Sequence, residues 1–276
     1  AYSLSPEAMA NKSDEDLAKE MQKIVRKDIQ IGNSDYRATL NSLRRIVQSI
    51  GGETNKTEAD METDGVGSQF GLEMQIERYK QSLLKLESLR LVDEKKLLDF
   101  ASSLRAVPGK NFVFFFYQRE FRPEINPSVL NTMMSLYQEQ PNILNDLQDL
   151  FNLYKRDSTI NAVDLERAFA DSGVNFNFIF MNKESMYMFG AIMREQSEDV
   201  FDIFSKIAKA TGGRALMTQN PAVSFQAAAD FSEKYYLLSY SPTAETAKES
   251  SFRKIEVKLK KGPGYEIYHQ VGYYYR

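Results

Sequence analysis

Cysteine is absent from the 276-residue chain, and histidine occurs only once, at His269. Without cysteine the chain forms no disulfide, zinc finger, iron-sulfur cluster or cysteine nucleophile. With one imidazole it forms no site that needs two histidine ligands, which excludes the common zinc and non-haem iron sites. These absences exclude whole classes of enzyme but leave the redox compartment open.

Long apolar runs and a strong net charge are missing as well. No run approaches the roughly 18 residues that cross a bilayer, so we expect no membrane span. The chain has 35 Lys and Arg against 38 Asp and Glu, a formal net charge of −3. Domains that bind nucleic acid usually carry a basic excess, so we expect no nucleic-acid partner. No intact secretory signal is visible at the start, although a processed or truncated start would look the same.

The short motifs of well-known catalytic and nucleotide sites are also absent. The sequence contains no phosphate-binding G-x-x-x-x-G-K-[ST], no dinucleotide-binding G-x-G-x-x-G and no G-x-S-x-G nucleophile elbow. With one histidine and no cysteine, the usual catalytic triads reduce to a Ser-Lys option. We therefore expect no cofactor.

The first third of the chain reads as mainly helical. Residues 14–27 form an amphipathic pattern with acids first and bases last, which favours a helix. A possible strand follows at 28–32, and then a helix over 37–50. Residues 51–71 are rich in Gly, Thr and acidic residues and predict a mobile acidic surface loop.

From there to Pro108 the sequence has neither glycine nor proline. Its leucine-rich periodicity predicts one long helix, or two helices joined near Asp93, whose carboxylate would cap the second. Residues 128–172 read as a helical insertion of two or three short helices, with Asn161 placed to cap one of them.

Two strands stand out. Phe112 to Tyr117 is a continuous apolar run, which suits an interior strand of a mostly parallel sheet with both faces covered. Residues 174–182 alternate apolar side chains with asparagines and predict a second strand. A helix from Ser197 ends in two glycines, and a short strand over 214–217 follows. After a helix over 222–232, three strands are expected at 234–242, 251–261 and 265–275.

Strand and helix alternate in this order, as they do in a parallel sheet covered by helices. We predict an α/β fold, a doubly wound and mostly parallel sheet, with antiparallel C-terminal strands and the helical insertion. One α/β domain is expected to span residues 1–276.

Several segments carry a family resemblance in their order and spacing. They are IAKATGGRALM at 207–217, YYLLSYSP at 235–242, FRKIEVKLKK at 252–261 and GYYY at 272–275. Upstream, LDFASSLRAVPGKNFVFFFYQREF supplies a helix, a Gly-Lys turn and a strand. Together, over residues 95–276, they resemble bacterial von Willebrand factor A-related (VWFA-related) domains. The resemblance implies a Rossmann-like fold, protein binding and an extracytoplasmic (periplasmic or secreted) location.

The sequence departs from this family at the metal site. Members often hold a divalent ion with an Asp-x-Ser-x-Ser loop, and no such string occurs here. Gln118-Arg119-Glu120 stands where the family more usually has Asp-Gly, and the charge of Arg119 would oppose a cation. We expect a degenerate or absent metal site. The family's first strand and helix would precede Ala1, so the chain either starts late in a longer protein or lacks that part of the sheet.

The candidate working surface lies where the two clear strands end. Gln118, Arg119 and Glu120 follow the first strand, and Asn182, Lys183 and Glu184 follow the second. Neighbouring parallel strands end at the same edge of a sheet, where side chains are free to contact a ligand. Mixed charge beside apolar residues suits a protein interface. The alternative is that these residues are polar only because loops are polar.

The function expected from these features is a non-enzymatic, adhesion-type protein-interaction module. The alternative is an enzyme of unknown class with its site at Gln118, Arg119 and Glu120. A further candidate surface is the basic, tyrosine-rich segment 252–276, which could bind an acidic partner, a glycan or nucleic acid. That segment reads more simply as half-buried strands whose charges deter edge pairing.

Overall fold

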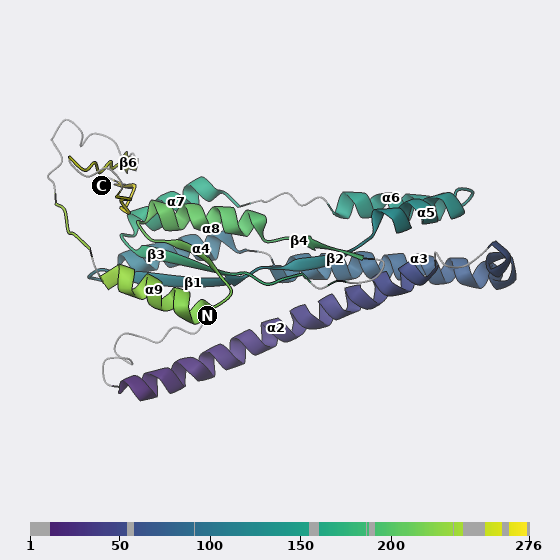
Figure 1. Ribbon diagram of the computed structural model, residues 1–276, viewed down its shortest axis with the longest axis horizontal. Coiled ribbons are helices and arrows are strands. Elements are labelled where there is room, and N and C mark those ends of the chain that lie inside the picture. The colour runs from purple at the N-terminus through teal and green to yellow at the C-terminus, as the bar shows by residue number, and fades with distance from the viewer. Residues whose placement is uncertain are drawn as a thin grey trace. The chain divides into compact units, whose positions relative to one another are not determined.

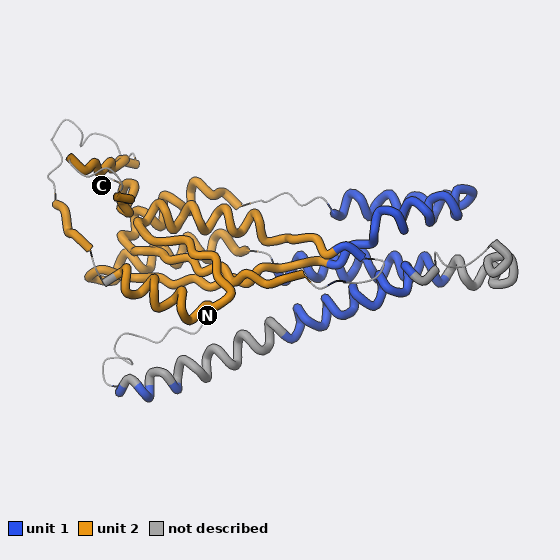
Figure 2. The backbone as a smooth tube through the Cα atoms, viewed as in Figure 1, with its two compact units in different colours: residues 1–91, 123–156, 187–192 blue, residues 92–122, 157–186, 193–276 orange. Residues whose placement is uncertain are grey.

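The computed structural model describes the backbone of most of the chain, namely residues 12–53, 58–90, 92–154, 160–185, 187, 191–233, 235–239, 252–260 and 265–274. The chain divides into two compact units (Figure 2). The first comprises residues 1–91, 123–156 and 187–192, and the second comprises residues 92–122, 157–186 and 193–276. The sequence predicted a single α/β domain over residues 1–276, and the parallel sheet lies in the second unit.

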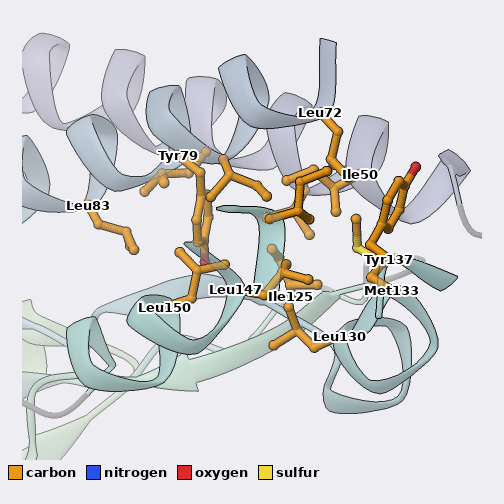
Figure 3. Packing of buried hydrophobic residues seen from close by; sticks show 14 of the residues in the cluster. Ile50, Leu72, Tyr79, Leu83, Ile125, Leu130, Met133, Tyr137, Leu147 and Leu150 are labelled. Atoms are coloured by element: carbon orange, nitrogen blue, oxygen red, sulfur yellow. The ribbon is translucent and has the colours of Figure 1, made fainter. Parts of the chain in front are cut away.

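The first unit is built from helices around one apolar core (Figure 3). Its helices are α2 (Asp14–Glu53), α3 (Glu58–Arg90), α5 (Pro127–Leu136) and α6 (Pro141–Leu153). The core side chains of α2 and α3 recur every three or four residues, so each helix buries one face. They are Leu43, Val47 and Ile50 of α2 and Leu72, Ile76, Tyr79, Leu83 and Leu86 of α3. Ile143, Leu147 and Leu150 bury the matching face of α6.

Two polar links join α3 to the segments that pack on it. The Tyr79 hydroxyl donates to the Pro123 carbonyl at 3.0 Å and lies 3.0 Å from the Tyr154 hydroxyl. Lys80 pairs with Asp146 of α6 at 2.6 Å and with Asp149 at 3.4 Å. Burial lowers the pKa of Lys80, but the hydrogen bonds and charges of the two aspartates outweigh burial and leave it raised.

Helix α2 is continuous through the segment predicted as a strand at 28–32, so that prediction is wrong. The loop predicted over 51–71 is also corrected, because α2 continues to Glu53 and α3 begins at Glu58, while 54–57 lie outside the described residues. Glycine in a helix costs about 1 kcal/mol relative to alanine. Ile50 and Leu72 are both buried in the core, and such packing of an apolar face outweighs local propensity.

The second unit holds a three-stranded parallel sheet in the order β1-β3-β5 (Figure 1). Its strands are β1 (Phe112–Gln118), β3 (Asn175–Met181) and β5 (Ala215–Thr218). Phe115 lies beside Phe178, and Phe180 lies beside Met217. The mixed α/β class predicted from the sequence, with parallel strands, is confirmed.

Helices cover both faces of this sheet. On one face, phenylalanines of β3 pack with α4 (Glu94–Arg105), α7 (Ala162–Asp171) and α8 (Glu198–Ala210) in a single buried cluster. On the other face lies α9 (Pro221–Glu233), whose Phe225 ring is 4.8 Å from that of Phe114 and 6.0 Å from that of Phe116. The predicted caps are confirmed, since Asp93 accepts from the Lys96 amide and Asn161 from the Asp164 amide.

The position of β1 differs from the prediction. In the described part of the chain β1 is an edge strand and β3 is the central one. Phe112 is 37% exposed and Phe116 is 43% exposed, whereas all six residues from Asn175 to Phe180 are buried. The unbroken apolar run therefore located a strand correctly, but among the described strands β1 lies at the edge of the sheet and not, as predicted, in its interior.

Short strands complete the architecture. β6 (Phe252–Lys254) and β7 (Gly272–Tyr274) pair antiparallel, as expected for the C-terminal strands. Residues 235–239 are exposed and lie outside any strand, and residues 234 and 240–242 of that predicted strand lie outside the described residues. β2 (Phe121–Ile125) pairs with β4 (Ala191–Glu195), which the sequence did not suggest.

Of the helices within 128–172, α5 and α6 belong to the first unit and α7 to the second. Among the helices described, none has an apolar stretch long enough to cross a membrane.

Candidate functional site

The three parallel strands end side by side. Gln118 lies beside Met181, which lies beside Thr218. The Arg119 amide donates to the Met181 carbonyl at 2.9 Å, and the Asn182 amide donates to the Thr218 carbonyl at 2.6 Å. Sheet pairing thus continues one residue past β1 and β3 and holds the two predicted triplets against each other.

Arg119 is the best-anchored side chain of this edge. Its Nη1 donates to Asn182 Oδ1 at 2.9 Å, and its Nη2 forms an ion pair with the Glu195 carboxylate of β4. Its guanidinium lies 5.3 Å from the centre of the Phe121 ring. The hydrogen bond that Arg119 donates to the Glu195 carboxylate raises the pKa of Arg119, so the cation is held in place and fully charged.

A serine and two backbone groups extend this network. Ser197 Oγ donates to Glu195 Oε1 at 3.2 Å and accepts from the Glu120 amide at 3.3 Å. The Gln196 amide donates to the Glu120 carbonyl at 3.0 Å. Ser197 precedes α8, as the sequence predicted, but makes no side-chain cap bond to that helix. Its hydroxyl positions Glu195 instead.

The six predicted site residues therefore separate into two groups. Arg119 and Asn182 are in direct contact, and Glu120 joins the network through its backbone. Gln118, Lys183 and Glu184 are exposed beyond that anchored pair. Glu195 and Ser197 were missed, because nothing local in the sequence links them to residues some 76 positions earlier.

The TGG segment at 211–213 has a structural role in the second unit. Thr211 Oγ1 accepts from the Phe176 amide at 3.0 Å, and Gly212 has a φ of 74°. A Cβ on Gly213 would lie 1.9 Å from the Phe176 carbonyl oxygen. The two glycines follow the end of α8 and let the chain pass directly against β3. The sequence had predicted that they end this helix.

Polar side chains of β3 form a second network on the face covered by α9. Asn177 Nδ2 donates to Asn175 Oδ1 at 2.7 Å and to Ser232 Oγ at 3.3 Å. Asn175 Nδ2 donates to the Gly212 carbonyl at 2.9 Å, and Asn177 Oδ1 accepts from the Arg214 amide at 3.2 Å. All three side chains are buried. This set joins β3, α9 and the segment that leads from α8 into β5, and its polar atoms are used within the fold.

Comparison of the chain with protein-family models, with curated proteins and with solved structures gave no match. In the described part of the chain no three Asp, Glu or His side chains gather closely enough to hold a metal ion. The expected lack of a metal site stays a prediction. The carboxyl ends of the parallel strands therefore present the Arg119 cation, which is already paired with Glu195. Beside it lie the exposed side chains of Gln118, Lys183 and Glu184.

Proposed function

We propose that this chain is a non-enzymatic protein-interaction module of the VWFA-related type, and that its partner contacts the carboxyl ends of β1 and β3. One observation carries the proposal. Arg119 is fixed by Asn182 and Glu195, and next to this anchor Gln118, Lys183 and Glu184 are exposed. An ordered backbone with free side chains of both charges can bind another protein at little cost in conformational entropy.

The pairing of Arg119 is the reason to prefer binding over catalysis. An anionic substrate that used this guanidinium would have to displace the Glu195 carboxylate, which Ser197 also holds. A protein partner can instead use the exposed side chains and leave the ion pair intact. The family resemblance is supported by the parallel sheet, the TGG turn against β3 and the antiparallel C-terminal pair. On that resemblance we also propose an extracytoplasmic location.

The test is site-specific photo-crosslinking in the cells that make the protein. A photoreactive amino acid replaces Lys183 in one variant and, as a matched control, the exposed Lys206 of α8 in another. We expect a discrete protein adduct from position 183 that is absent from position 206. A failure to trap any protein at 183, or identical adducts from both positions, would contradict the proposal.

A charge exchange then tests whether the exposed side chains themselves bind. Lys183→Glu combined with Glu184→Lys keeps the net charge and reverses the order of charge at the end of β3. We expect the adduct to be lost from a photoreactive group at Gln118 while the thermal midpoint stays unchanged, because exposed charges contribute little to stability. If the adduct persists undiminished, the partner binds elsewhere.

A further inference from the structure

A series of polar contacts leads from the start of α8 to the end of β3. Ser197 Oγ donates to Glu195 Oε1 at 3.2 Å, and Oε2 of the same carboxylate pairs with Arg119 Nη2. Arg119 Nη1 donates in turn to Asn182 Oδ1 at 2.9 Å. Both oxygens of Glu195 are therefore in use, and the series ends on the residue that directly precedes the exposed Lys183.

Asn182 is held from two sides. Its amide donates to the Thr218 carbonyl at 2.6 Å, which joins it to the end of β5, and its side chain joins it to Arg119 at the end of β1. The next two residues, Lys183 and Glu184, are exposed and lie outside any strand. Their conformation therefore depends on how firmly Asn182 is held.

Ser197 does not act as serines at its position usually do. A serine directly before a helix commonly accepts a hydrogen bond from an amide of the first turn and so stabilises the helix. Ser197 precedes α8 and is fully buried, yet it makes no such bond to the helix. Its hydroxyl contacts Glu195 and the Glu120 amide instead. Features that depart from a local rule in this way are expected at functional sites.

We propose that Glu195 and Ser197 are positioning residues of the binding surface. They hold Arg119 and, through it, Asn182, and so keep Lys183 and Glu184 in the arrangement that the partner binds. This inference rests on the proposed function. It goes beyond it, because it assigns a part in binding to two residues that need not touch the partner.

The physical reason is conformational entropy. A partner that binds a loose segment has to order it, and ordering each residue of a backbone opposes binding. A segment that is already ordered avoids this cost. Lys183 and Glu184 are two such residues, so loss of the anchor at Asn182 should weaken binding by about tenfold or more. Stability should change little, because a partly exposed ion pair contributes little to it.

The test uses variants that separate the polar contacts of Glu195 from its volume. Glu195→Leu removes both contacts and keeps a side chain of similar size. Glu195→Gln has the shape of the natural residue and can still bond to Arg119 and Ser197, so it should restore the wild-type behaviour. Ser197→Ala removes one contact only. Ser232→Ala is the matched control, since Ser232 is also a buried serine of the second unit but belongs to the separate network of β3 and α9.

The first measurement is made on the purified 276-residue chain and needs no partner. Backbone order parameters from nuclear magnetic resonance report motion on the picosecond to nanosecond timescale, with values of about 0.85 for rigid backbone. We expect such values at residues 182–184 in the natural chain, in Glu195→Gln and in Ser232→Ala. They should fall below about 0.6 in Glu195→Leu, and by less in Ser197→Ala. Low values in the natural chain, or unchanged values in Glu195→Leu, would overturn the proposal.

The second measurement repeats the photo-crosslinking from position 183 in each of these backgrounds. We expect the yield of the protein adduct to fall about tenfold in Glu195→Leu, and to be retained in Glu195→Gln and Ser232→Ala. An adduct that Glu195→Leu leaves undiminished overturns the positioning role alone. If position 183 gives no adduct even without a second substitution, the proposed function is wrong, and the positioning role in binding is wrong with it.

Discussion

β1 and β3 are neighbouring parallel strands of equal length, yet the strand with the more apolar sequence is the less buried of the two. β1, with six consecutive apolar residues, is an edge strand among those described, and its Phe112 and Phe116 are partly exposed. β3 has asparagine at two of its seven positions, yet it is central, and residues 175–180 are all buried. The asparagines are tolerated because each one is hydrogen-bonded within the fold.

The difference shows that burial follows the position of a strand in the sheet more closely than its apolar content. A central strand is covered on both faces and both edges. An edge strand loses cover along its outer side, whatever its sequence. Both strands pack phenylalanine rings against α8. The ring centre of Phe115 of β1 lies 4.4 Å from that of Phe204, and the Phe176 ring of β3 stacks on the same ring with its centre 6.0 Å away.

The largest effect is expected where β3 meets the TGG turn. Gly213→Ala would place a methyl group 1.9 Å from the Phe176 carbonyl oxygen, which is backbone and cannot move aside without disrupting β3. The free energy of unfolding should fall by about 4 kcal/mol or more, measured by urea denaturation followed by circular dichroism. Gly71→Ala is the control, because its added Cβ meets nothing within 4 Å. It should stabilise the chain slightly, since alanine favours a helix over glycine. Equal losses in both variants would contradict the close approach.

Truncating one phenylalanine on each strand compares centre with edge directly. Phe178→Ala on β3 removes a ring that is 0% exposed and should cost about 3 to 5 kcal/mol. Phe116→Ala on β1, where the ring is 43% exposed, should cost about 1 kcal/mol. If the two losses are equal, β1 is as well covered as β3, and its position as an edge strand is wrong.

The polar network of β3 should contribute less than its phenylalanines but more than an exposed contact. Asn177→Ala removes the side-chain acceptor of the Arg214 amide and one donor to Asn175 Oδ1, and should cost about 2 kcal/mol. Ser232→Ala on α9 removes another member of the same network. In a double-mutant cycle the two losses should be clearly non-additive. Additive losses would mean that the two side chains act independently.

The smallest effect is expected at the end of β1. Arg119→Met removes the ion pair with Glu195 and the bond to Asn182 but keeps much of the side-chain volume. Since the Arg119 side chain is 33% exposed, the loss should be below about 1 kcal/mol and should shrink further as salt is added. Gln118→Met, one residue earlier and exposed, should change nothing measurable. A salt-independent loss would indicate that Arg119 acts through packing.

Local features of the fold were predictable from the residues. Asp93 and Asn161 cap helices as expected, because a cap needs only a side-chain oxygen within three residues of an amide. Of the three parallel strands, β1 and β3 were located from an apolar run and from alternation. The contact between Arg119 and Asn182 followed from the rule that parallel strands end together, since the pairing of β1 with β3 brings both residues to one edge.

Other features depended on contacts between residues far apart in the chain. The order β1-β3-β5 is a matter of which strands pair, and no short segment carries that information. The helix that begins at Glu58 leads into residues buried with Ile50 of α2, so its formation depends on packing that its glycine-rich sequence does not indicate. The partners of Arg119 across the sheet, Glu195 and Ser197, come from a strand and a helix start that local patterns do not connect.

Residue types and their spacing were enough to determine the capped helix starts after Asp93 and Asn161, the strands β1 and β3, and the polar side chains that follow those strands, because these depend on neighbours within a few positions. Which strand becomes central, which apolar faces are covered and which charges become paired were decided by tertiary structure. These outcomes depend on the free energy of burying whole surfaces against each other, and that free energy exists only once distant segments are in contact.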